Sequence, residues 1–216
     1  DTLTDLGVIC VAASGNNFGL DYYNPITEEY GAWITTGVEQ DDYYYTTENS
    51  QQGVSLPSAI PDVISVGATW LSNDSITSFS QRDDEIQDVF APGGNITSAA
   101  IGGGTTTMSG TSMSSPYMAG SILLMQQVAE EELERKLTTS EIKKIINENS
   151  TTIFDGDDEY GDVTPTNENY NFVDIESYLN AVSDLKNPLF HYVDLTSETT
   201  SADFGISNYL QQSFTN

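Results

Sequence analysis

One continuous apolar run near the start of the chain restricts the fold most, and it reads GVICVAAS over residues 7–14. The run is rich in β-branched residues and is broken by Ser14, Gly15 and Asn16. Unbroken apolar runs of this length are typical of strands buried on both faces of a parallel sheet. The single cysteine, Cys10, lies inside the run, so we expect a buried small hydrophobe without chemistry.

Further strands and helices follow this run in alternation. Short, mostly apolar segments at residues 63–66 and 88–91 end at Gly67 and at Pro92-Gly93-Gly94, which predicts two more strands. Residues 116–137 have a near-helical apolar period, formed by Met118, Ile122, Met125, Ala129, Leu133 and Leu137 and widened by Leu123 and Val128. This alternation predicts an α/β domain with a mostly parallel sheet.

Two shorter helices are expected near the end of the domain. Thr138-Thr139-Ser140-Glu141 reads as a capping box, and the helix after it would present Ile142, Ile145 and Ile146. Residues 174–182 carry apolar side chains on one side, namely Ile175, Tyr178, Leu179 and Val182.

The charge balance excludes several partners. The sequence contains 33 Asp and Glu and only six Lys and Arg, which gives a formal net charge of -27. Such a surface repels nucleic acid and anionic membranes, and it suits a protein that works in salt, although solubility alone is an equal explanation. No window is apolar enough to span a membrane. The first residues, DTLTDLG, contain no starting Met, so we expect any signal peptide to lie outside this chain.

Two segments differ in composition from the rest. Residues 17–55 hold six tyrosines, Tyr22, Tyr23, Tyr30, Tyr43, Tyr44 and Tyr45, among seven acids and lack a regular apolar period. We interpret them as a long surface excursion, either functional or disordered. Residues 186–216 are rich in Ser and Thr, which is typical of a linker or of the start of a further domain.

The stretch SGTSMSSPYMAG, residues 109–120, suits a serine nucleophile. A serine hydroxyl needs a base, a close approach by small residues and donors for the oxyanion that it creates. Small residues surround Ser112, and the helical pattern follows it, so Ser112 is predicted at a helix amino terminus where free N–H groups favour negative charge. Taken alone, the same pattern also fits an ordinary serine N-cap.

This stretch resembles the serine motif of the subtilisin-like serine proteases, the subtilases. Three further segments resemble that family in the right order: VAASGNNFG, LPSAIPDVISVGAT and SITSFSQRDDEIQDVFAPGGNI. Four collinear matches are more specific than any single short motif. The resemblance implies a doubly wound α/β/α domain over residues 1–185 that is incomplete at its amino terminus.

The resemblance also implies roles for individual residues. Ser112 matches the nucleophile, and Asn16 matches the asparagine whose amide joins the backbone N–H of the serine in the oxyanion hole. The wall of the specificity pocket would be formed by Ala12, Ala13, Ser14 and Gly15. The family usually has His where this chain has Tyr117, a structural position that leaves the catalytic groups unaffected. Protein or peptide substrates would bind as extended strands against exposed strand edges.

The largest departure from the family concerns the catalytic triad. In subtilisins the Asp and His precede the oxyanion strand, yet only DTLTDLG precedes that strand here. The one histidine, His191, lies far beyond Ser112 and outside any matching motif. Three explanations stay open: a fragment whose missing segment carries Asp and His, one chain of a two-chain enzyme, or a noncatalytic binding module.

The resemblance further implies a secreted or cell-surface endopeptidase that forms an acyl-enzyme on Ser112 without a cofactor for the chemistry. The acidic excursion at residues 17–55 is hypothesised to favour basic peptides, with a halophile-style surface loop as the alternative. A structural Ca²⁺ is a weaker hypothesis. It would use the acidic loop at residues 155–162 through Asp155, Asp157 and Asp158, where a solvated acidic turn is the alternative.

Overall fold

The computed structural model of the chain describes residues 2–16, 18, 21–24, 29–34, 44–46, 53–72, 75–156 and 165–186. Side chains are described for these residues except for residues 2, 5 and 21–46. Asp1–Lys186 form one compact unit. The tail that follows, His191 included, lies outside the described residues.

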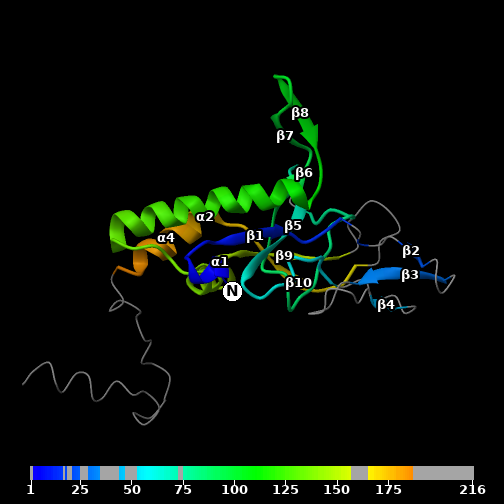
Figure 1. Cartoon of the computed structure of the whole chain (residues 1–216), viewed down its shortest axis with the longest axis horizontal. Coiled ribbons are helices and arrows are strands. Elements are labelled where there is room, and N and C mark those ends of the chain that lie inside the picture. The colour runs from blue at the N-terminus through cyan, green and yellow to red at the C-terminus, as the bar shows by residue number, and fades with distance from the viewer. Residues whose placement is uncertain are drawn as a thin grey trace, which may run out of the picture. The chain divides into compact units, whose positions relative to one another are not determined.

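The main sheet has five strands in the spatial order β1-β5-β6-β10-β9. They are β1 (Cys10–Ala13), β5 (Val63–Trp70), β6 (Val89–Gly94), β10 (Asn169–Phe172) and β9 (Thr151–Phe154). The first four are parallel, and β9 pairs antiparallel with β10 (Figure 1). The α/β class with a mostly parallel sheet, predicted from the alternation of strands and helices, is confirmed.

The half-buried residues of β1 correct the expectation of a strand buried on both faces. Among the described residues β1 lies at the edge of the sheet and pairs with β5 alone, with Cys10 opposite Val63 and Ala13 opposite Val66. All four of its residues are half-buried, so Cys10 is not the buried hydrophobe that the sequence predicted. The central strands β5 and β6 are almost wholly buried because they have neighbours on both sides.

A long helix, α2 (Thr111–Leu133), runs across β1, β5 and β6 (Figure 1). It begins five residues before the start predicted at Pro116 and ends before Leu137, which is nevertheless buried in the core. Leu123, predicted to widen the apolar stripe, is 69% exposed. The helical residues that do face the sheet are Met118, Ile122, Met125 and Ala129, and all of them are buried as predicted.

The two shorter helices complete the same layer. α3 (Thr139–Asn149) opens with the predicted capping box, in which Thr138 Oγ1 accepts from the backbone N–H of Glu141. α4 (Ile175–Asp184) is capped by Asp174 and packs against α2 and α3. A short helix, α1 (Thr2–Asp5), precedes β1. The main core lies between these helices and one face of the sheet, with Ile64, Val66, Val89 and Ala91 as the contributions of the strands.

In the part of the chain that the structure describes, the opposite face of the sheet has no long helix over it. A small cluster of Ile76, Phe90 and Tyr170 packs there. The α/β/α sandwich is therefore incomplete, as the resemblance implied. A hairpin of β7 (Ile96–Ala99) and β8 (Thr105–Met108) projects away from the body of the unit (Figure 1).

The tyrosine-rich segment contains regular structure that its composition did not predict. Three strands, β2 (Asp21–Asn24), β3 (Glu29–Ile34) and β4 (Tyr44–Thr46), form an antiparallel sheet of their own. The remaining residues of the segment up to residue 52 lie outside the described ranges, apart from Phe18. The hypothesis that the segment selects basic peptides stays a prediction.

Candidate active site

The carboxyl end of β1 and the amino terminus of α2 meet at one corner of the sheet. After Ala13 the chain stays beside β5, because Ser14 N donates to Val66 O at 2.9 Å. Asn16 follows and reaches the first residue of α2, 95 positions later in the sequence. Ligands of open α/β sheets bind at the carboxyl ends of the strands, so this corner is the expected place for a site.

Asn16 and Thr111 are joined by two hydrogen bonds. Oδ1 of Asn16 accepts from the backbone N–H of Thr111 and from Thr111 Oγ1, both at 2.9 Å. Thr111 Oγ1 in turn accepts from Gly15 N at 3.2 Å. A backbone N–H can only donate, so its bond fixes which end of the amide is oxygen. The Nδ2 group of Asn16 is thereby presented as a donor on the other side.

Gly110 is the N-cap of α2 and lies directly against Asn16. Its φ of 153° falls in the region that favours glycine, and a Cβ there would stand 3.2 Å from Asn16 Nδ2. Gly93, at the end of β6, allows a second close approach: a Cβ would overlap Ser114 Oγ and lie 2.8 Å from Gly110 O. Only glycines let β6, the N-cap and Asn16 come together this closely.

Ser112 is the second residue of α2, and its side chain is exposed. The predicted place at a helix amino terminus is confirmed. The first four N–H groups of a helix have no partner within it. The N–H of Thr111 donates to Asn16 and that of Met113 to Gly110 O, whereas the N–H of Ser112, between them, has no hydrogen bond to the described residues. The first turn contains no acidic residue that would oppose a developing negative charge.

The four residues assigned to the specificity pocket occupy different environments. Ala12, Ala13 and Gly15 are half-buried, whereas Ser14 is fully buried. Ser14 Oγ donates to Gln81 O at 3.0 Å, so this hydroxyl is used within the protein. Their role as a pocket wall stays a prediction.

Two residues that the sequence did not single out organise this corner. Thr111 lies inside the serine motif, and its hydroxyl bonds to Asn16 and Gly15 were not foreseen. Gln81 is fully buried, and its Oε1 accepts from Ser55 Oγ at 2.5 Å. Its backbone N–H donates to Gly15 O at 2.8 Å, so the segment around Gln81 lies against the strand end that carries Asn16.

The calcium hypothesis receives no support from Asp155. Its side chain is fully buried, one oxygen pairs with Arg82, and the other accepts from Thr166 N at 2.8 Å and Thr166 Oγ1 at 2.6 Å. Asp157 and Asp158 lie outside the described residues. Within the described ranges no group of three or more His, Cys, Asp or Glu side chains is arranged to hold a metal ion. Both oxygens of Asp155 are thus engaged within the protein, and the calcium hypothesis as a whole stays a prediction.

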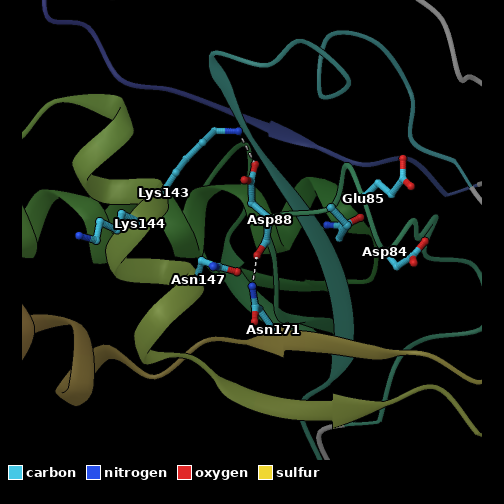
Figure 2. Close-up of a pocket in the computed structure, with 8 residues that line it drawn as sticks. Asp84, Glu85, Asp88, Lys143, Lys144, Asn147 and Asn171 are labelled. Atoms are coloured by element: carbon cyan, nitrogen blue, oxygen red, sulfur yellow. Dashed lines mark hydrogen bonds and ion pairs between the residues drawn. The ribbon is translucent and has the colours of Figure 1, made fainter. Parts of the chain in front are cut away.

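A polar cleft of about 420 Å³ lies elsewhere, where β6 begins rather than where β1 ends (Figure 2). Two of its charges are paired with each other, because Lys143 Nζ lies 2.8 Å from Asp88 Oδ2, and Asn171 Nδ2 donates to Asp88 O at 3.1 Å. Asp84 and Glu85 also line it. It lies at the amino ends of the parallel strands, opposite the end where such sheets bind ligands, and we assign it no catalytic role.

Comparison with known proteins identifies the family to which a chain with this site geometry belongs. A sequence profile described as the subtilase family matches residues 1–185. The chain belongs to the subtilase family. It is 36% identical over 89 residues to the "Major intracellular serine protease" of Bacillus subtilis (strain 168), and 41% identical over 89 residues to the "Intracellular serine protease" of Paenibacillus polymyxa. Both matches cover 41% of this chain and 27% of the relative.

A fungal relative and the solved structures agree with this membership. The "Subtilisin-like protease 1" of Arthroderma gypseum is 45% identical over 73 residues, which cover 34% of this chain and 15% of the relative. The maturation protease PagA superposes with a TM-score of 0.58 at 20% identity, covering 84% of this chain and 52% of that protein. The self-cleaved protease domain of PatA gives 0.54 at 17% identity, with the same coverage. At these identities the structures establish the fold.

The chain spans about a quarter of the length of the first two curated relatives and about half of these two structural neighbours. The two bacterial relatives are named as intracellular, so the expected secretion does not follow from them. No helix among the described residues is both long and apolar enough to cross a membrane.

Proposed function

We propose that this subtilase chain supplies the nucleophile and the oxyanion donors of a serine endopeptidase. The observation that carries the proposal is the hydrogen bond of the Asn16 amide to Thr111, the residue directly before exposed Ser112 at the start of α2. The donors there are fixed before any substrate arrives, because Thr111 holds the amide oxygen of Asn16. Preorganised donors of this kind stabilise the charge that develops in acyl transfer.

The proposed reaction proceeds in two halves. A base takes the proton of Ser112 Oγ while the oxygen attacks the carbonyl carbon of the peptide. The oxyanion formed on the carbonyl oxygen accepts from Ser112 N–H and Asn16 Nδ2. The C–N bond then breaks, the amine leaves with the proton from the base, and water hydrolyses the resulting ester on Ser112.

The base and its supporting carboxylate are proposed to come from protein outside this chain. In the part of the chain that the structure describes, β1 has a strand partner on one side only, and the apolar residues before it, Leu3, Leu6 and Val8, are exposed. A depression of about 440 Å³ beside them is lined in part by Ile9 and Leu123. An open edge with exposed apolar neighbours favours a further segment of protein that pairs with β1 and carries Asp and His.

Substrates are proposed to be protein or peptide chains bound in extended form. A secreted or cell-surface location is proposed from the family resemblance, with the intracellular relatives as the contrary observation. Detection of the protein in the culture medium rather than in the cell fraction would test the location.

The activity is tested by labelling the protein from its native source with a serine-reactive fluorophosphonate, followed by mass spectrometry of the peptide that spans residues 109–120. We expect the label on Ser112, and its loss in Ser112→Ala but not in the matched variant Ser115→Ala. An unlabelled wild type with intact fold would favour the noncatalytic binding module.

A further inference from the structure

A buried ion pair lies near the site and has no part in the proposed chemistry. Arg82 and Asp155 pair with each other, and both side chains are fully buried. Arg82 is one of only six Lys and Arg residues in the sequence. Burying two charges costs more free energy than a surface pair, and apolar residues of similar size often serve stability equally well. Stability alone therefore does not explain why this ion pair is buried.

The guanidinium of Arg82 is held in one orientation by several contacts. Nη2 donates to Thr77 O at 2.9 Å, Nε donates to Ser80 O at 3.2 Å, and Nη1 pairs with Asp155. The carbon at the centre of the guanidinium lies 3.8 Å from the centroid of the Phe18 ring. A planar cation at this distance over an aromatic face is a favourable cation–π contact.

Asp155 is fixed as firmly as its partner. Thr166 donates to its second oxygen through both the backbone N–H and the hydroxyl. The same hydroxyl lies 2.9 Å from the phenol oxygen of Tyr170, whose pKa is raised by burial. With both oxygens engaged, the carboxylate cannot turn away from Arg82.

Phe18 connects this pair to the oxyanion residue, because it lies two positions after Asn16. The chain around Asn16 is anchored on both sides by one segment: Gln81 N donates to Gly15 O at 2.8 Å, and Phe18 N donates to Phe79 O at 3.2 Å. Arg82 belongs to this anchoring segment and adds the contact with the ring. The residues flanking Asn16 are therefore hydrogen-bonded to the segment of residues 79–82, and the ion pair sets the orientation of this segment.

We propose that Arg82, held by Asp155, is a positioning residue that fixes Asn16 through the ring of Phe18. Its effect on hydrolysis rests on the proposed function, whereas its effect on the geometry of Asn16 does not. The alternative is a pair that contributes only to stability. The two explanations predict different hydrogen-exchange protection of the Thr111 N–H when the pair or the ring is removed.

The first experiment measures hydrogen exchange of individual amides in the full chain by NMR. The Thr111 N–H donates to Asn16 Oδ1, so its protection reports the placement of Asn16. Phe18→Leu removes the ring and keeps both members of the ion pair, and Phe172→Leu is the matched change in β10. We expect Phe18→Leu to lower protection of Thr111 about ten-fold while the amides of Ile64 and Val66 in β5 keep theirs. Phe172→Leu should leave Thr111 unchanged relative to these β5 amides.

A second variant tests the role of the two charges of the ion pair. Arg82→Met combined with Asp155→Asn removes both charges together and keeps an oxygen acceptor for Thr166, so no unpaired ion stays buried. It should weaken Thr111 protection in the same selective way. Equal protection of Thr111 in wild type and both variants, or a loss shared evenly with Ile64 and Val66, would overturn the positioning role.

The second experiment measures peptide hydrolysis by the complete active protein. Phe18→Leu is expected to lower kcat about ten-fold with little change in KM, because the oxyanion forms only after substrate has bound. A change confined to KM would contradict the proposal. If the wild type hydrolyses no peptide, the proposed function fails, and the exchange experiment still decides the role of Arg82.

Discussion

The amide oxygen of Asn16 accepts two hydrogen bonds from Thr111, one from the backbone N–H and one from the hydroxyl, each at 2.9 Å. The two residues come from β1 and α2, so the pair of bonds fastens the end of the edge strand to the first residue of the long helix. The same contact orients Nδ2 toward Gly110, beside the exposed Ser112. One relationship thus sets both the start of the helix and the direction of an oxyanion donor.

Removal of the Asn16 amide should affect turnover more than binding. In the active protein, Asn16→Ala is expected to lower kcat by about two to three orders of magnitude with little change in KM; removal of this donor in a subtilisin is the reference case for that figure. Steady-state hydrolysis of a peptide substrate measures both constants. Asn147→Ala, an exposed asparagine in α3, is the control and should leave both unchanged. Similar kinetics for the two variants would count against the oxyanion role.

The Thr111 hydroxyl should contribute to stability and to turnover. Thr111→Val removes the acceptor of Gly15 N and one donor to Asn16, so we expect about 1–3 kcal/mol less free energy of unfolding and a smaller kcat loss than in Asn16→Ala. Thr69→Val is the matched control, because the buried Thr69 hydroxyl has no hydrogen-bond partner among the described residues, and its removal should be neutral or stabilising. Urea unfolding measures the free energy of unfolding of both variants. Equal losses of stability in the two variants would refute the role assigned to the Thr111 hydroxyl.

A side chain at Gly93 should displace the start of α2. A Cβ there would lie 2.7 Å from Ala68 Cβ and would overlap Ser114 Oγ, so Gly93→Ala is expected to cost about 1–3 kcal/mol or more. Gly120→Ala in the same helix is the control. Apart from its chain neighbours and the backbone of its own helix, no atom of the described residues lies within 4 Å of a Cβ at Gly120, and the change should stabilise the protein by about 0.5–1 kcal/mol. Thermal unfolding shows whether each variant is stabilised or destabilised. A stabilising Gly93→Ala would contradict the close approach of β6 to the start of α2.

The cap of α3 should confer a pH-dependent part of the stability. The hydrogen bond from Arg135 lowers the pKa of Glu141 from 4.5 to about 2. Because the folded-state pKa is depressed, this stabilisation is present above about pH 4.5 and is lost as the pH falls toward 2. Glu141→Gln keeps the capping oxygen and removes the charge. The stability difference between wild type and variant should therefore shrink over this range in urea titrations, and a constant difference would exclude the linkage.

The helices show where sequence periodicity succeeds and where it does not. The capping box at Thr138 and Glu141 and the apolar sides of α3 and α4 depend on residues close in sequence, and the structure has them as predicted. The start of α2 was predicted at Pro116, yet the helix begins at Thr111. A proline inside a helix usually marks its first turn, and here the bond from Thr111 to Asn16 extends the helix further back.

The burial of β1 could not be predicted from composition. An apolar run indicates a strand in a parallel sheet, and this is correct for residues 10–13. Whether the strand lies at the centre or at the edge depends on the partners available to it, and within the described ranges β1 pairs only with β5. Cys10 is half-buried for that reason.

The sequence by itself determined the α/β class, the family and the position of Ser112 at a helix amino terminus, because each depends on a local pattern or a motif of fixed order. The tertiary structure alone decided that Thr111 orients the amide of Asn16, that Gly93 makes room for the helix, and that Arg82 and Asp155 are buried together under Phe18. These contacts join residues tens of positions apart, and local periodicity carries no information about which distant side chains the folded sheet brings together.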